Sequence, residues 1–310
     1  MEVSEHRHMT NQKLERSPDK KKKSFGHLLY IGPHLILFVI FGILPLVYGT
    51  YVSFTRWDLV GQPEWVGFAN YKEILFNLDS TFHKQFFNGV KNTLIFVGIS
   101  VPLLMIIPLL IALALNTKVK ATSLFQSIFY IPGLFSISAV ALIWSLVFNK
   151  RLGPINNVFG SDANWFTSQP HAWILILVVS VWWGIGGNLI IYRAALSSIS
   201  KDVFEAADID GAGPVKKFFY ITIPSIKFPI LYTLVMSTLA SFNIYGQPVM
   251  LTDGGPTGST TVAMMYIRDL AFGSGQSVAG VASAMAMLLG MIMIIVSIFQ
   301  FVVLSKDDTK

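Results

Sequence analysis

The sequence contains no cysteine, which excludes disulfide bonds, thiol catalysis and cysteine-ligated metal sites. Charged residues are also scarce. They make up 13% of the 310 residues, whereas a typical soluble domain carries about 25%. Hydrophobic residues account for 53% of the chain. This balance favours a membrane protein over a soluble one.

Several chemical motifs are missing too. No GxxxxGK[ST] phosphate loop is present, so we do not expect the chain itself to bind ATP. The 6 histidines show no metal-ligand spacing, and neither HExxH nor GxSxG occurs. The sequence therefore predicts no enzyme activity, no metal site and no cofactor. The basic residues behind the net charge of +6 lie in loops and tails between apolar runs. We therefore expect them to set the orientation of the chain in a membrane and not to bind nucleic acid.

Long uncharged segments dominate the rest of the chain. Each exceeds the roughly 20 residues that a helix needs to cross a bilayer. A charge at the centre of such a helix costs about 3 kcal/mol, so its absence from every segment is informative. Buried soluble helices rarely stay uncharged for so long. The sequence predicts an all-α membrane protein with six transmembrane helices, within the segments Ser24–Thr55, Asn92–Thr117, Ala121–Asn149, Ala163–Tyr192, Phe228–Thr252 and Leu270–Ser305.

The ends of the chain are polar. We predict a tail at residues 1–27, a six-helix domain at residues 28–305 and a second tail at residues 306–310. The first apolar run is longer than the usual core of a cleaved signal peptide, so we expect it to be retained.

With the N-terminus inside, the inner segments hold 16 lysines and arginines and the outer ones hold 7. This bias predicts that both termini are cytoplasmic.

Two predicted loops carry further signals. The first outer loop, about residues 56–88, is the longest and contains enough polar residues for a short surface helix. Another loop contains the segment Leu251–Pro256, with two glycines followed by a proline, which predicts a turn on the outer face.

A polar segment, Glu205–Ala212, lies on the predicted inner face. We expect a short helix with Asp202 as its N-cap and Glu205 completing a capping box. Gly211 and Gly213 are suited to end this helix, and Pro214 prevents its continuation. Ala206 and Ala207 would leave a shallow face for a partner's groove. The alternative is a solvated surface helix that merely links two spans.

Spans four and five contain neutral polar residues and no ionisable group near their centres. This pattern suits an uncharged, polyhydroxylated ligand, although glycines and hydroxyls also serve to pack helices together. It disfavours a carrier driven by protons or sodium. The residues are Trp182, Trp183, Gly184, Gly186, Gly187, Asn188, Ser237, Thr238, Ser241, Asn243, Tyr245 and Gln247.

The polar segment also resembles a known family. Glu205-Ala206-Ala207 followed by Asp210-Gly211-Ala212 is similar to the EAA loop of permease subunits in binding-protein-dependent ABC importers. Further segments resemble the sugar-importer branch, which includes the maltose and glycerol-3-phosphate permeases. These are Trp65–Tyr71, Asn92–Leu94, Ile131–Leu134 and Leu251–Pro256.

The resemblance implies a multi-pass permease in a bacterial cell membrane, with a cytoplasmic coupling helix between spans four and five. A cytoplasmic ATPase dimer would bind ATP and dock on that helix. A second homologous permease subunit and an extracellular solute-binding protein are also implied. The residues carried over for coupling are Glu205, Ala206, Ala207, Asp210 and Gly211.

Similarity to the maltose permease further implies a sugar site at Trp183, Gly184, Gly187, Ser241 and Ile244. Ser241 and Ile244 stand where that permease has amides, so the contacts must differ. Asn243 is added from its own chemistry. No basic cluster accompanies these positions, which favours a sugar, most simply an oligosaccharide. The alternatives are glycerol-3-phosphate or another non-sugar solute in the same importer class, and an ion-coupled secondary carrier.

Overall fold

The computed structural model describes residues 26–117, 120–273 and 278–305. The chain divides into two units, Met1–Tyr48 and Gly49–Lys310. The described part of the first unit is helical. It contains α1 (Gly26–Phe38), the π-helical turn η1 (Val39–Ile43) and the start of α2 (Leu44–Ser53). Helix α1 begins inside the predicted tail, and residues 1–25 and 306–310 lie outside the described residues, so the tail boundaries stay a prediction.

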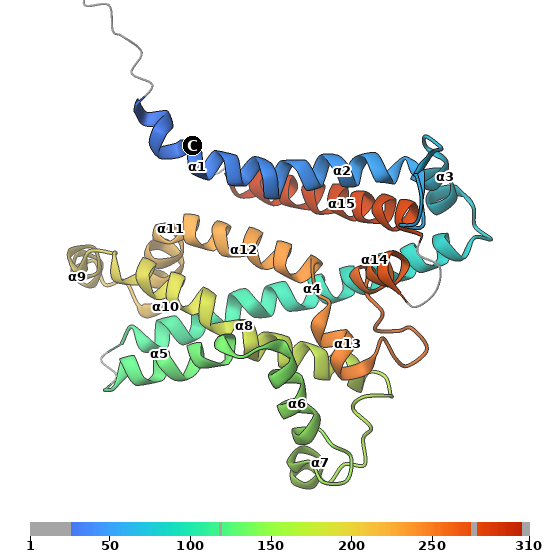
Figure 1. Cartoon of the computed structure of the whole chain (residues 1–310). Coiled ribbons are helices and arrows are strands. Elements are labelled where there is room, and N and C mark those ends of the chain that lie inside the picture. Colours follow the sequence, from blue (N-terminus) through green and yellow to red (C-terminus); the bar gives the residue numbers. More distant parts are fainter. Residues whose placement is uncertain (1–25, 118–119, 274–277, 306–310) are drawn as a thin grey trace, which may run out of the picture. The chain divides into compact units, whose positions relative to one another are not determined.

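In the described residues of the second unit, the regular structure is helical apart from one two-stranded antiparallel ladder, which pairs Thr55 with Trp65 and Arg56 with Glu64. The predicted all-α fold is confirmed. In chain order (Figure 1), its elements after α2 are β1 (Thr55–Arg56), β2 (Glu64–Trp65), α3 (Ala69–Phe76), α4 (Thr81–Leu115), α5 (Thr122–Tyr130), η2 (Ile131–Leu134), α6 (Ile137–Val147), α7 (Pro154–Phe159), α8 (His171–Ser197), α9 (Lys201–Ile209), α10 (Pro214–Lys217), η3 (Phe218–Thr222), α11 (Ile223–Ser225), α12 (Lys227–Phe242), α13 (Gly246–Thr252), α14 (Ala263–Phe272) and α15 (Ala279–Ser305).

Within the described residues, 4 helices are long and apolar enough to cross a membrane, and the number rises to 6 if each of two bent helix pairs is one span. The helices are Tyr30–Ser53, Thr81–Leu115, His171–Ser197 and Ala279–Val303. The bent pairs are Thr122–Leu134 with Ile137–Val147, at 104°, and Pro214–Ser225 with Lys227–Phe242, at 70°. Four of the six predicted spans contain or overlap a continuous helix, the third matches the first bent pair, and the fifth overlaps the second bent pair only through α12.

Predicted span five differs most from a single helix. Helix α12 ends at Phe242, three residues without helical structure follow, and α13 begins at Gly246. Pro248 lies in the first turn of α13, where a missing backbone N–H leaves no helical hydrogen bond unmade. The segment predicted as one span, Phe228–Thr252, is thus interrupted near its middle.

Helices α4, α8 and α12 pack together through apolar side chains and a few internal hydrogen bonds. The Asn188 amide on α8 donates to the Leu104 carbonyl of α4 at 2.8 Å and to Ser237 Oγ of α12 at 2.9 Å. The hydroxyls of Tyr192 and Thr233 lie 2.6 Å apart. Such bonds between membrane helices contribute about 0.6 kcal/mol each, so they fix the alignment of α8 with α12 as well as adding stability.

The N-terminal half of α4 is hydrogen-bonded to the segment that leads into α14. The Asn92 amide donates to the carbonyls of Gly258 and Thr261, at 3.0 and 2.9 Å. The Ala263 amide donates to Thr93 Oγ1 at 3.0 Å. The predicted turn at Leu251–Pro256 is confirmed, since Asp253 and Gly254 take positive φ angles of 48° and 76° just after α13.

Candidate functional site

Helix α9 carries the predicted coupling residues, and its N-terminus differs from the prediction. The N-cap is Ser200, whose hydroxyl accepts a hydrogen bond from the Asp202 amide at 3.2 Å. The predicted cap at Asp202 is therefore wrong. Serine and aspartate cap helices about equally well, so their ranking could not separate the two positions. Asp202 lies in the first turn, where the helix dipole favours its charge.

The C-terminus of α9 confirms the predicted role of Gly211. This residue takes φ +70°, and its amide donates to the Asp208 carbonyl at 3.1 Å. The following amide, of Ala212, donates to the Ala207 carbonyl at 2.9 Å. This pair of bonds is the Schellman arrangement, which a left-handed glycine permits. Pro214 then begins α10 as its first residue.

The two adjacent alanines lie in different environments. Ala206 is exposed, whereas Ala207 is only 9% exposed and packs within its own chain. The expectation that both form one open face is therefore wrong. Glu205 and Asp210 are exposed as well. The open surface of α9 consists of its acids, Lys201 and Ala206, with Val203 and Ile209 as apolar side chains that are 46% and 88% exposed.

An ion pair connects α9 with the next helix. The Lys217 ammonium of α10 contacts the Asp208 carboxylate of α9. From Pro214 the chain remains helical through Ser225 and then bends by 70° into α12. Figure 1 shows α9 and α13 at opposite ends of α12. Helix α12 thus connects the polar segment with the break in span five.

A cavity of about 430 Å³ lies at that break. It brings together five of the six predicted ligand residues, namely Trp183, Gly184, Ser241, Asn243 and Ile244. Gly187 lies one turn further along α8, is exposed and does not line the cavity. The other lining residues are Phe96, Leu104, Ile137, Ser180, Ala240, Tyr245, Gly246 and Gln247.

Hydrogen bonds hold the polar walls of this cavity. The Trp183 indole donates to the Phe135 carbonyl at 3.2 Å, and Ser100 Oγ donates to Ser241 Oγ at 3.1 Å. The Asn243 amide nitrogen donates to the Leu239 carbonyl at 2.8 Å. No described residue donates to the Asn243 side-chain oxygen, which leaves it available to a ligand.

The sequence prediction missed one polar lining residue, Ser180, and left Tyr245 and Gln247 in the wider polar cluster without adding them to the six ligand residues. Ser180 is 7% exposed, and its hydroxyl has no partner among the described residues. It precedes Trp183 and Gly184 by about one helical turn, and that spacing could have identified it. No lining residue carries a charge, and no cluster of three metal-ligating side chains occurs in the described part of the chain.

Residues 76–306 match the family of binding-protein-dependent transport system inner membrane components. The chain belongs to this family. It is 31% identical to the probable ABC transporter permease protein YesP of Bacillus subtilis, with 93% of each chain covered. It is 32% identical to the multiple sugar-binding transport system permease protein MsmF of Streptococcus mutans, with 92% of this chain and 97% of that one covered.

The fold agrees with a solved transporter. A chain in the crystal structure of a bacterial ABC transporter involved in the import of the acidic polysaccharide alginate matches with a TM-score of 0.77 and 25% identity. The match covers 92% of this chain and 96% of that chain. The prediction of an inner-membrane ABC importer permease, and not an enzyme, is confirmed.

Proposed function

We propose that this permease forms half of the translocation pathway for a sugar, with an oligosaccharide as the favoured substrate. The uncharged cavity at the break in span five carries this proposal, because its indole, amides and hydroxyls suit a polyhydroxylated ligand. A phosphorylated solute would call for an arginine or lysine, which the lining lacks. The names of MsmF and of the alginate importer, both of which refer to carbohydrates, support the same class.

We assign energy coupling to α9. An ATPase closing beneath the membrane would pull on its exposed surface, which includes Glu205, Ala206 and Asp210. The ion pair between α9 and α10 and the continuous helical path into α12 would carry that displacement toward the cavity. Because Asn188 and Tyr192 bond α8 to α12, these two helices, which supply Ser180, Trp183, Gly184, Ala240 and Ser241 of the cavity wall, would move together.

The proposed partners follow from the family and from charge. A binding-protein-dependent permease takes its solute from a binding protein, and ATP binds to a separate ATPase. A second permease subunit supplies the other half of the pathway. The excess of lysine and arginine in the segments that include α9 supports a cytoplasmic location for this helix and both termini.

Reconstitution of the assembled transporter in lipid vesicles tests the proposal. Uptake of neutral oligosaccharides is expected only with the solute-binding protein on one side and ATP on the other. Glycerol-3-phosphate should not compete. Uptake by this chain alone under a sodium or proton gradient would contradict the assignment.

A further inference from the structure

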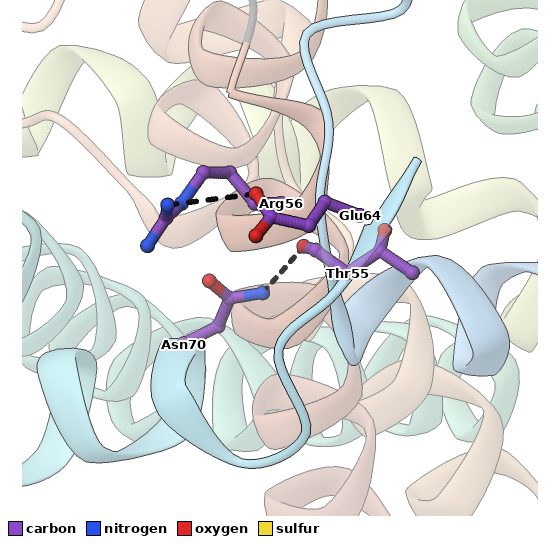
Figure 2. Close-up of polar contacts among 4 residues, drawn as sticks. All are labelled: Thr55, Arg56, Glu64 and Asn70. Carbon is purple, nitrogen blue, oxygen red and sulfur yellow. Dashed lines mark hydrogen bonds and ion pairs between the residues drawn. The ribbon is translucent and has the colours of Figure 1, made fainter. Parts of the chain in front are cut away.

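A second polar hollow lies where the loop between α2 and α4 meets the start of α15 (Figure 2). We call it the outer recess, because the proposed orientation places it on the extracellular face. Its volume is about 600 Å³, and it shares no residue with the cavity at the break in span five. Its polar side chains include Arg56, Asp58, Gln62, Glu64, Asn70 and Glu73.

The wall of the outer recess is preformed. Asn70 is 8% exposed, and its amide nitrogen donates to the carbonyls of Ser53 at 2.9 Å and Thr55 at 2.8 Å. Gly280 of α15 lies so close that an added Cβ would be 1.9 Å from the Thr55 carbonyl oxygen. The loop and the helix therefore hold this wall in one arrangement before any ligand arrives.

The Asn70 side chain has one unused group. Both of its amide hydrogens are occupied, but no described residue donates to its oxygen. In Figure 2 the nitrogen points to Thr55, and the oxygen points away from it. This oxygen is not one of the side-chain atoms that are buried without a partner, so it faces the open space of the recess. A ligand that brings an N–H or O–H group into the recess can donate to it.

The charge of the recess selects among such ligands. Arg56 Nη1 lies 3.6 Å from Glu64 Oε2, so these two charges largely offset each other. Asp58 and Glu73 are lining carboxylates that have no ion-pair partner among the described residues. Hydrogen bonds from Ser80 and then Asn77 hold the pKa of Glu73 below its ordinary value. The recess therefore favours a cation that can donate hydrogen bonds.

The surroundings favour a protein as the source of that cation. Exposed apolar side chains lie on the same loop, and Val60, Trp65 and Phe68 are among them. Apolar and aromatic side chains around a polar pocket are typical of a protein interface. A free metal ion or a small amine would leave them uncovered.

We propose that the outer recess receives a lysine or arginine side chain of the extracellular solute-binding protein. This inference rests on the proposed function, which supplies that partner and the orientation. The cationic group would donate to the Asn70 oxygen and to the carboxylates of Asp58 and Glu73. The apolar side chains beside the recess would pack against the partner's surface.

The test measures docking in the assembled transporter in nanodiscs. Its own solute-binding protein is titrated at low and at high salt. The recess variant combines Asp58→Asn with Glu73→Gln. The control combines Asp79→Asn with Asp269→Asn, which removes two acids outside the recess from the same predicted face. Equal yields of complex and equal basal ATP hydrolysis show that both variants assemble.

We expect the recess variant to bind the solute-binding protein about tenfold more weakly at low salt. The binding should also lose most of its dependence on salt, because the partner's cation no longer meets a carboxylate in the recess. The control should dock as the unchanged chain does. Glu73→Lys should weaken docking further, and reversing one basic residue on the solute-binding protein should restore it.

Unchanged docking by the recess variant, with unchanged salt dependence, would overturn this inference and leave the proposed function standing. A raised KM for sugar with unchanged docking would overturn it as well and identify the recess as a sugar contact. Failure of the unchanged transporter to bind any solute-binding protein would overturn the proposed function and this inference together.

Discussion

At the scale of single residues, two glycines are required for different physical reasons. Gly211 needs a left-handed backbone, since its φ is +70° and no atom lies within 4 Å of an added Cβ. Gly280 has no space, because its added Cβ would lie 1.9 Å from the Thr55 carbonyl oxygen. The first position therefore limits backbone conformation, and the second limits volume.

Gly211→Val should disrupt coupling more than Gly211→Asn. A β-branched residue in the left-handed region costs about 1–2 kcal/mol or more, whereas asparagine tolerates that region. We expect the valine variant to reach the membrane but to lose most ATP-driven uptake, while the asparagine variant keeps most of it. Uptake per assembled complex is the measurement. Equal loss in both variants would show that volume, and not φ, matters here.

Gly280→Ala should lower the thermal stability of the permease and the yield of folded chain. The new methyl group would push the Thr55 strand away from α15. Gly290→Ala is the matched control, since it lies in the same helix and meets nothing within 4 Å. Thermal unfolding of the detergent-solubilised complex measures both, and a similar Tm for the two variants would contradict the expectation.

At the scale of elements, α9 presents one alanine to the outside and one to its own chain. Ala206→Leu should weaken ATPase docking without destabilising the permease. Ala207→Leu should instead overpack a buried position, which costs about 1–3 kcal/mol. Co-purification of the ATPase and thermal unfolding of the permease separate the two effects. If both variants failed to co-purify with the ATPase and both kept the stability of the unchanged permease, the difference in burial between Ala206 and Ala207 would be contradicted.

The break between α12 and α13 should control substrate affinity. Asn243→Ala and Gln247→Ala each remove an amide from the cavity, and a neutral hydrogen bond contributes about 0.5–1.5 kcal/mol. We expect KM for uptake to rise by about 2- to 10-fold while ATPase docking is unchanged. Gly187→Ala, outside the cavity, should leave KM alone. A rise in KM for Gly187→Ala alone would indicate that the substrate binds closer to the C-terminal end of α8 than the cavity lies.

Both the success and the failure of sequence-based prediction can be traced to particular residues. The absence of charge located the four continuous candidate spans, because a bilayer penalises charge wherever a helix crosses it. The break at Asn243–Tyr245 was missed because no charge marks it, although Pro248 is a weak signal for a new helix start. The hydrogen-bonding partners of Asn70 lie 15 and 17 residues away in the chain, and the burial of Ala207 is a property of the folded chain, so local patterns contain neither.

At the scale of the whole molecule, orientation can be measured directly. The chain has no cysteine of its own, so each introduced cysteine is a unique label. Asp79→Cys in the outer loop should react with a membrane-impermeant maleimide in intact cells. Asp210→Cys, at the end of α9, should react only after the cells are opened. The reverse pattern would invert the proposed topology.

The break in span five has a consequence for how this family changes its substrates. A straight helix bonds its backbone polar groups to one another, so only its side chains contact a ligand. A new ligand would then require new side chains along the whole helix. Here three residues without helical structure already bend the chain around a hollow. Substitutions from Asn243 to Gln247 can therefore alter which solute is held while the α4, α8 and α12 framework stays as it is. One inherited scaffold can serve relatives whose cargoes differ in size and charge.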